Sequence, residues 1–379
     1  MGRVFFSHAV GANRMPFVAG ATPESSHWYS LATAYRDGLL ACGEEVTPIL
    51  RPEIYQSEVA RQLLGVSAGD WHMVVKPIEH IRPFHQLANV FVSDWPFTTL
   101  SSETGGISPF FHQVRLLNQA AAVACCTEAT MRALNAAGVT NAVHAPPFRH
   151  ARTGLGISPF RATATTCTVM AVAEAHSLVR LHTPLIRGFA SARARNRQLR
   201  LALVVSGAGS IPASVLRAEL LAASNVEDGE GDIVVTPGSL TTAIYQSEAD
   251  FFLWEGLPLG LPLPLIDAAL AGMPLIAPAG AAATVDLGSA GFVRLATVSR
   301  PVEPMEEPVV QVMSLHLDVP NEDGICEALL AAASLNGEER ASLARFARRE
   351  IESRFGLGAF RAGLARLADQ LSVDRHDRR

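Results

Sequence analysis

The chain has 379 residues, of which 49% are hydrophobic and 18% are charged, and its net charge is −5. These values exclude an intrinsically disordered protein, and the lack of a basic domain argues against a nucleic-acid partner. Because one ordinary core rarely organises so long a chain, we expect two domains.

The cysteines and the apolar runs indicate where the protein resides. Five cysteines sit in apolar surroundings without zinc or redox spacing, so we interpret them as free thiols in a reducing compartment. They are Cys42, Cys125, Cys126, Cys167 and Cys326. No secretory signal precedes the first apolar segment, and no uncharged run reaches the roughly 18–20 residues of a membrane span. We expect a cytoplasmic protein; peripheral membrane contact and the oligomeric state stay open.

Short apolar strands alternate with amphipathic helices over the first 150 residues. The expected strands are 4–7, 46–50, 71–75, 89–92, 121–125 and 141–145, and the expected helices are 25–42, 110–119 and 128–137. Thr127 can cap the last of these helices, and Gly138 lies just past its end. Strands separated by helices favour a mainly parallel sheet with both faces covered.

Residues 146–165 interrupt this alternation with prolines, glycines and arginines, and we interpret them as an interdomain linker. The alternation then resumes and ends in a helical region. The expected strands are 168–173, 199–205, 233–235, 250–253 and 275–277, and the expected helices are 184–192, 240–247, 265–271, 324–334, 337–355 and 357–371. Two such α/β halves form a cleft, and ligands bind where the carboxyl ends of the strands face it.

The segment 260–278 carries the most specific pattern. Residues 263–277 read LPLIDAALAGMPLIA, and the spacing from Asp250 to Asp267 has no gap. This pattern resembles the "L-P-L-L-E-A-M-A-C-G-x-P-V-I-A" motif of retaining glycosyltransferase family 4, and segments 89–138 and 127–147 resemble the N-terminal half of that family. The resemblance implies the GT-B fold, an α/β architecture of two doubly wound, Rossmann-like domains facing a cleft, with C-terminal helices.

The resemblance also assigns the domains. It implies that residues 1–150 form the acceptor-side domain and that residues 151–356 bind the nucleotide sugar. The last helix, 357–371, is expected to pack back on the first domain, and 372–379 to be a disordered tail.

Three of the family's motifs differ in this chain. Leu259 stands where the family has the first Glu of its E-x7-E pair, and Asp267 replaces the second. The family's Gly-Arg after the first strand of the second domain is absent, and Arg180 replaces the following lysine only loosely. The N-domain histidine is replaced by the region of Asp94.

The resemblance implies a donor role for several residues. Asp267, expected in the first turn of its helix behind Pro264, would accept hydrogen bonds from the ribose, unless it only caps the helix. Arg180 would bind the diphosphate, with Arg187 a weaker candidate, and the alternative is a solvated arginine. Glu255 would contact the sugar in place of the missing Glu, unless it is an ordinary surface residue.

Glycines and N-domain side chains complete the candidates. Gly207, Gly209 and Gly280 follow strands and would let the backbone approach the donor, although plain turns are the alternative. Gly11 lies in the first strand-to-helix loop with the polar residues His8, Asn13 and Arg14. Asp94 would orient an acceptor hydroxyl, unless it forms an Asx turn. Lys76, the single lysine, would bind a phosphate or the acceptor, unless it is a snorkelling surface residue.

Together these residues predict a glycosyltransferase that moves a sugar from a nucleoside-diphosphate donor to a glycan, a lipid-linked glycan or a small molecule, with retention. No cofactor and no metal is expected, because helix N-termini, loop N–H groups and cations can hold a diphosphate. The alternative is a catalytically degenerate GT-B protein that acts as a binding or scaffold subunit, which the loss of the first Glu and of the Gly-Arg pair favours. A GT-B epimerase or phosphorylase is a third class; without a lysine in the second half, a pyridoxal-dependent phosphorylase is disfavoured.

Overall fold

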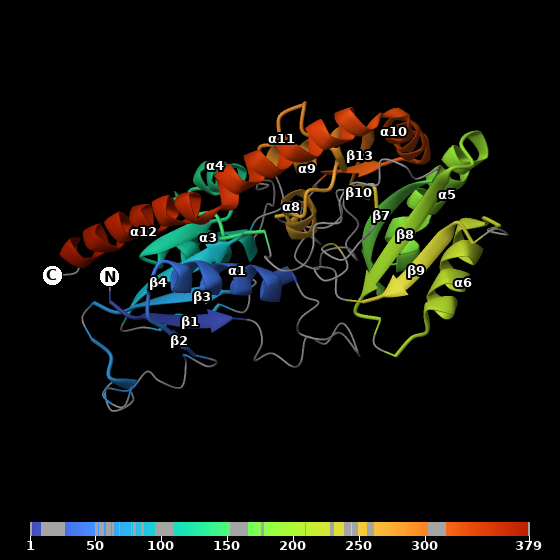
Figure 1. Ribbon diagram of the computed structural model, residues 1–379. Coiled ribbons are helices and arrows are strands. Elements are labelled where there is room, and N and C mark those ends of the chain that lie inside the picture. The colour runs from blue at the N-terminus through green and yellow to red at the C-terminus, as the bar shows by residue number, and fades with distance from the viewer. Residues whose placement is uncertain are drawn as a thin grey trace.

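Two parallel six-stranded sheets organise the computed structural model of the protein (Figure 1). The structure describes residues 2–8, 27–49, 52, 57, 62, 64–67, 69–76, 78, 81–84, 87–94, 109–151, 166–175, 178–208, 210–227, 231–238, 244, 249–255, 261–301 and 316–377. The predicted α/β fold with two doubly wound sheets is confirmed.

The first sheet has the strand order β2-β1-β3-β4-β5-β6, and all its neighbours are parallel. Its strands are β1 (Val4–His8), β2 (Val46–Pro48), β3 (Trp71–Val75), β4 (Ala88–Ser93), β5 (Ala122–Cys125) and β6 (Ala142–His144). The helices α1 (His27–Ala41), α3 (Pro109–Asn118) and α4 (Glu128–Ala136) accompany them. The central strands are mostly apolar and buried because helices cover both faces of a parallel sheet. Thr127 caps α4 as predicted, with its side chain accepting from the N–H of Thr130.

The second sheet has the order β12-β11-β10-β7-β8-β9 and is also parallel. Its strands are β7 (Cys167–Glu174), β8 (Leu199–Ser206), β9 (Ile233–Pro237), β10 (Phe251–Leu253), β11 (Leu275–Pro278) and β12 (Val293–Leu295). The helices are α5 (Leu178–Arg195), α6 (Ala213–Ser224), α8 (Leu263–Leu270), α9 (Ala279–Thr284) and α10 (Glu322–Ser334). Strands β13 (Thr297–Pro301) and β14 (His316–Pro320) form a separate antiparallel pair.

Each sheet reverses its strand order once. In the first sheet the reversal lies between β1 and β3, and in the second it lies between β7 and β10. In doubly wound proteins, ligands bind in the crevice outside the carboxyl ends of the strands at such a reversal. The topology therefore marks two places, one on each sheet, where ligand-binding residues are expected.

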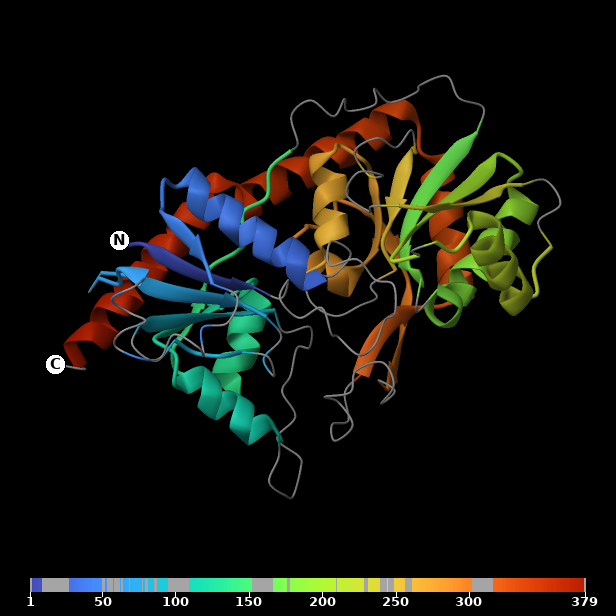
Figure 2. The same ribbon diagram turned by 90° about the horizontal axis from the view of Figure 1, so that it is seen from below.

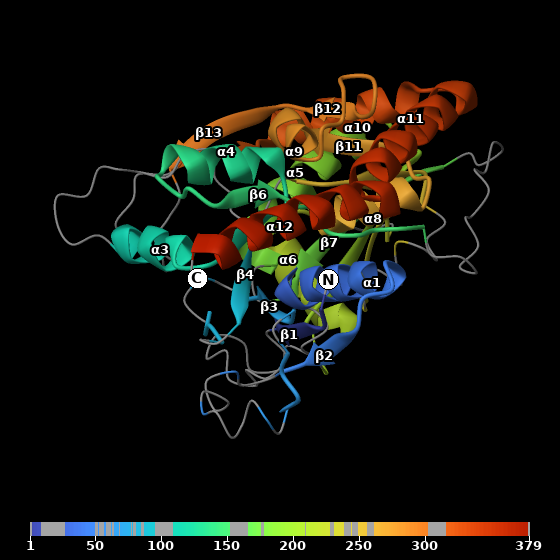
Figure 3. The same cartoon turned by 90° about the vertical axis from the view of Figure 1, so that its left-hand side faces the viewer.

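The last two helices connect the halves. Helices α11 (Gly337–Phe355) and α12 (Leu357–Asp377) follow α10, and α12 runs along the N-terminal half beside α1 (Figure 3). The ring centroids of Tyr35 and Phe360 are 6.1 Å apart. A Cβ on Gly38 would lie 2.7 Å from both Phe148 and Phe360, so only glycine lets α1 and α12 approach this closely. Helix α12 also contacts β5 and β6 of the first sheet.

Several elements differ from the expectation. Helix α5 begins at Leu178, six residues before the predicted start, and Pro184 lies inside it. Pro184 suggested a helix start because proline lacks the N–H that an interior position donates. Helix α6 and the pair β13–β14 were not predicted. Helix α12 continues to Asp377, so the helix extends into the tail that was expected to be disordered. No described helix combines the length and the apolar character that crossing a membrane requires.

Candidate active site

Asp94 joins the two halves of the molecule. It follows β4 at the carboxyl edge of the first sheet, and its side chain is 2% exposed. Both carboxylate oxygens accept the backbone N–H of Leu261, at 2.9 and 2.8 Å. Leu261 directly precedes Pro262, the N-cap of α8, and α8 lies between the two sheets (Figure 2). The carboxyl edge of the first sheet therefore meets the N-terminus of α8, where a negative charge is favourable.

His27 supplies the second partner of Asp94. It is the first residue of α1, and its Nε2 lies 2.5 Å from an Asp94 carboxylate oxygen. A buried carboxylate needs such partners because removing a charge from water is costly. The expected alternative, an Asx turn, is wrong: both carboxylate oxygens contact Leu261, and Pro96 has no N–H to donate to such a turn.

Asp267 is buried one turn deeper in α8 than predicted. It is the fifth residue of the helix, so the expectation of a first-turn carboxylate is wrong; the helix begins at Leu263, and Pro264 is its second residue. The Nε atom of Arg149 lies 3.7 Å from the Asp267 carboxylate and has no hydrogen-bond partner among the described residues. The backbone N–H of Arg149 donates to the carbonyl of Phe355 at 2.7 Å, which fixes this part of the chain between α8 and α11.

The strand-order reversal of the second sheet is occupied by His182 and Glu255. His182 is the fifth residue of α5, which follows β7, and Glu255 lies two residues beyond β10. The imidazole Nδ1 is 3.0 Å from the Glu255 carboxylate, and both side chains are 6% exposed. The alternative expectation that Glu255 is a surface residue is therefore wrong.

The reversal of the first sheet carries two basic groups. His8 ends β1 and is paired in register with Val75, and Lys76 follows directly on β3. Burial lowers the pKa of His8, and the positive charges of Lys76 and Arg36 lower it further. Because His8 is paired in register with Val75, the residue before Lys76, the two basic residues are neighbours at the carboxyl edge. Lys76 is half-buried.

The remaining candidates have different outcomes. Gly207 follows β8 with φ 68°, a left-handed conformation that suits glycine. Gly280 is exposed in the first turn of helix α9, so the loop expected there is a helix. Arg187 donates to the carbonyl of Ser224 and pairs with Glu322 of α10, away from the reversal. The following lie outside the described residues: Gly11, Asn13, Arg14, Gly209, Leu259 and the side chain of Arg180.

Sequence reasoning missed three groups at these edges. His27 lies in a segment that was correctly predicted to be helical, and its position after the first strand is the one feature that could have identified it. His182 was assigned to a loop because the predicted helix began at 184. Arg149 was assigned to the linker, where the sequence does not indicate a partner in α8. Among the described residues, no three His, Cys, Asp or Glu side chains gather as metal ligands would.

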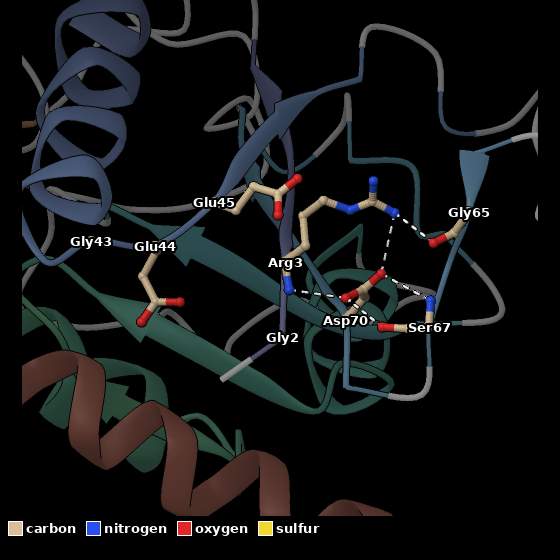
Figure 4. A pocket seen from close by; sticks show the side chains of 8 residues that line it. All are labelled: Gly2, Arg3, Gly43, Glu44, Glu45, Gly65, Ser67 and Asp70. Atoms are coloured by element: carbon tan, nitrogen blue, oxygen red, sulfur yellow. Dashed lines mark hydrogen bonds and ion pairs between the residues drawn. The ribbon is translucent and has the colours of Figure 1, made fainter.

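A polar pocket of about 550 Å³ lies at the opposite, amino end of the first sheet (Figure 4). Arg3 and Asp70 form its centre, and Ser67 donates to Asp70 through both its N–H and its hydroxyl. Burial acts to raise the pKa of Asp70, but the hydrogen bonds from Ser67 and Arg3 outweigh it and lower the pKa. Because this pocket faces away from the carboxyl edges, we do not include it in the candidate site.

Solved structures with the same fold are found, although no protein-family model matches the chain and no curated protein is similar in sequence. HepE from Anabaena, solved with UDP and glucose, is 14% identical, with a TM-score of 0.60 over 97% of this chain and 100% of HepE. Trehalose-6-phosphate synthase from Burkholderia multivorans is 12% identical, with a TM-score of 0.62 over the full length of both chains. S. aureus TarM, solved with UDP, is 12% identical, with a TM-score of 0.57; this chain spans only 55% of it. The fold is GT-B, the class of these glycosyltransferases.

Proposed function

We propose that the protein is a glycosyltransferase that moves a sugar from a nucleoside-diphosphate donor to a glycan, a lipid-linked glycan or a small-molecule acceptor. The transfer proceeds with retention and without a metal or cofactor, in the manner of glycosyltransferase family 4. UDP is the first nucleotide to test, because HepE and TarM were both solved with UDP.

The contact between Asp94 and Leu261 carries this proposal. It joins the carboxyl edge of one doubly wound sheet to the start of the helix that follows β10 of the other. Two ligand-binding edges that face each other suit a reaction with two substrates, because each edge can hold one of them. Asp267, in the same helix, is the carboxylate that the family resemblance assigns to the ribose.

The proposal assigns one substrate to each sheet. The second sheet, with His182 and Glu255 at its reversal, holds the donor, and the first sheet, with His8 and Lys76, holds the acceptor. Asp94 lies where the two meet, within reach of a hydroxyl once its contact with Leu261 opens. Retention requires no strong general base, so the small number of carboxylates is compatible with activity.

A panel of nucleotides and nucleotide sugars tests the proposal. Titration calorimetry with UDP, GDP and dTDP, and with UDP-glucose, GDP-mannose and dTDP-glucose, should give saturable binding of one nucleotide series. Release of the free nucleotide on incubation with acceptors should follow for the same donor. A folded sample that binds none of these compounds would overturn the proposal.

One observation favours the alternative of a catalytically degenerate, nucleotide-binding subunit. Asp94 is occupied by Leu261 and His27, and Asp267 lies against Arg149, so both carboxylates already have internal partners. Leu259 also replaces the first Glu of the family pair. Saturable binding of a donor, with neither transfer of its sugar to any acceptor nor hydrolysis of the donor, would support this alternative.

A further inference from the structure

His182 is a buried histidine at the one point of the second sheet where its topology predicts a ligand. Strands β7 and β10 are hydrogen-bonded neighbours, with Phe251 in register with Val169, and the strand order reverses between them. The α5 residue His182 follows the first of these strands, and Glu255 follows the second. Their contact therefore spans the crevice outside the carboxyl ends, where doubly wound sheets bind their ligands.

The imidazole of His182 uses only one of its two nitrogens. Nδ1 faces the Glu255 carboxylate at 3.0 Å, whereas Nε2 has no hydrogen-bond partner in the part of the chain that the structure describes. The side chain is 6% exposed, yet Nε2 is not one of the fully buried polar atoms that lack a partner, so this atom stays accessible to a ligand. A ligand atom that completes the hydrogen bonding of Nε2 explains why this polar pair is kept at the reversal.

The Glu255 contact decides what kind of atom Nε2 can receive. A carboxylate only accepts hydrogen bonds, so Nδ1 carries a proton, and in the neutral tautomer of the ring Nε2 carries none. Nε2 is then an acceptor, and it suits a hydroxyl group. A sugar presents several hydroxyls, whereas an unsubstituted diphosphate presents only acceptors.

We propose that Nε2 of His182 accepts a hydrogen bond from a hydroxyl of the donor sugar, with Glu255 fixing the orientation of the ring. This inference rests on the proposed function. It gives Glu255 a different role from the one that the sequence suggested, because Glu255 positions His182 and does not contact the sugar itself. The pair thereby supplies an acceptor in a chain where Leu259 replaces the first Glu of the family motif.

Comparison of UDP with UDP-glucose, and of GDP with GDP-mannose, tests the inference, because only one member of each pair carries the transferable hexose, whereas both carry the ribose. We expect His182→Phe to weaken binding of the sugar nucleotide about fivefold to tenfold, the worth of a hydrogen bond between neutral groups. The affinity for the nucleotide alone should stay unchanged, which also shows that the variant folds. His182→Gln keeps a side-chain acceptor and should lose less affinity for the sugar nucleotide than His182→Phe does.

Two further variants complete the design. Glu255→Leu removes the group that orients the ring and should also weaken the sugar nucleotide selectively. Arg187→Ala, on the same helix but directed towards α10, is the matched control and should bind both ligands as the wild type does. If His182→Phe lost the same affinity for the nucleotide as for the sugar nucleotide, or lost none, the inference would be overturned and the proposed function would remain. Absence of binding by the wild type would overturn both.

Discussion

Asp94 and Leu261 are 167 positions apart, yet both carboxylate oxygens of Asp94 accept the N–H of Leu261. Asp94 lies at the carboxyl edge of the first sheet, and Leu261 lies beyond β10 of the second sheet. The hydrogen bonds between them are buried. This contact holds the carboxyl edge of the first sheet against the start of α8. It also makes the start of α8, in the second half of the chain, dependent on a residue of the first half.

We predict that Asp94→Ala lowers the thermal stability measurably. The substitution leaves the buried N–H of Leu261 without its acceptor and removes the partner of His27, at an expected cost of roughly 2 kcal/mol. A thermal melt followed by circular dichroism measures the loss. Asp37→Ala, which removes an exposed carboxylate of α1 paired with Arg36, is the control and should melt close to the wild type. Equal melting of the two variants would mean that the contact with Leu261 contributes nothing in solution.

We predict that Asp267→Ala raises the dissociation constant of the donor nucleotide by about tenfold or more, the worth of hydrogen bonds to a charged group. The reason is the loss of the carboxylate that the resemblance assigns to the ribose. Calorimetric titration with UDP gives the value. Asp267→Asn, which leaves Arg149 next to a polar side chain, separates the loss of charge from the loss of packing. An unchanged dissociation constant in the alanine variant would show that Asp267 is not the ribose ligand.

The buried His72 should make stability depend on pH. Its Nε2 lies 2.7 Å from the Ser7 hydroxyl and its Nδ1 lies 2.8 Å from Asn89, and burial lowers the pKa of His72 from 6.5 to about 4. Between these values the unfolded chain binds a proton that the folded protein does not. The contribution of the neutral ring is therefore complete above pH 6.5 and falls by roughly 3 kcal/mol as the pH drops to 4.

Urea unfolding between pH 4 and pH 7 measures this effect, with the ring of His72 followed by NMR as the pH falls. The unfolding midpoint should decrease steadily below pH 6.5. A His72 ring that titrates near 6.5 in the folded protein would contradict the prediction.

We predict that Lys76→Met raises the pKa of His8 towards its ordinary value. The ammonium of Lys76 is the second cause that lowers this pKa, after burial, so the pKa should rise but stay below 6.5. An NMR titration of His8 measures the change. Arg36→Gln removes the third cause and should have the smaller effect. A His8 pKa that does not respond to Lys76→Met would show that the two groups do not interact and do not form one basic site on the first sheet.

The fold was predictable because the strands are short apolar runs that helices separate. Strand β3 was predicted at the residues where it is observed, 71–75, since each of its side chains is buried. The start of α5 was mistaken because Pro184 resembles a helix start from local sequence alone. In the helix, packing of Leu185, Ile186 and Phe189 in the core offsets the missing N–H.

The site was predictable only in part, because sequence patterns name residues and not their partners. Asp94 was a candidate because it follows a strand, and Asp267 was a candidate because of the family motif that the sequence resembles. Their partners, Leu261 and Arg149, are distant in sequence, and no periodicity relates them. His182 was missed for a different reason. No local sequence pattern identifies a histidine that faces the end of a neighbouring strand, and only the strand-order reversal between β7 and β10 indicates that a ligand is expected there.

A crystal structure of the protein with UDP bound tests the central claim most directly. The account predicts density for the nucleotide at the carboxyl edge of the second sheet, with the ribose hydroxyls at Asp267 and the diphosphate directed towards the start of α5. Density for UDP elsewhere, or a crevice without nucleotide between His182 and Asp267 at saturating UDP, would contradict it.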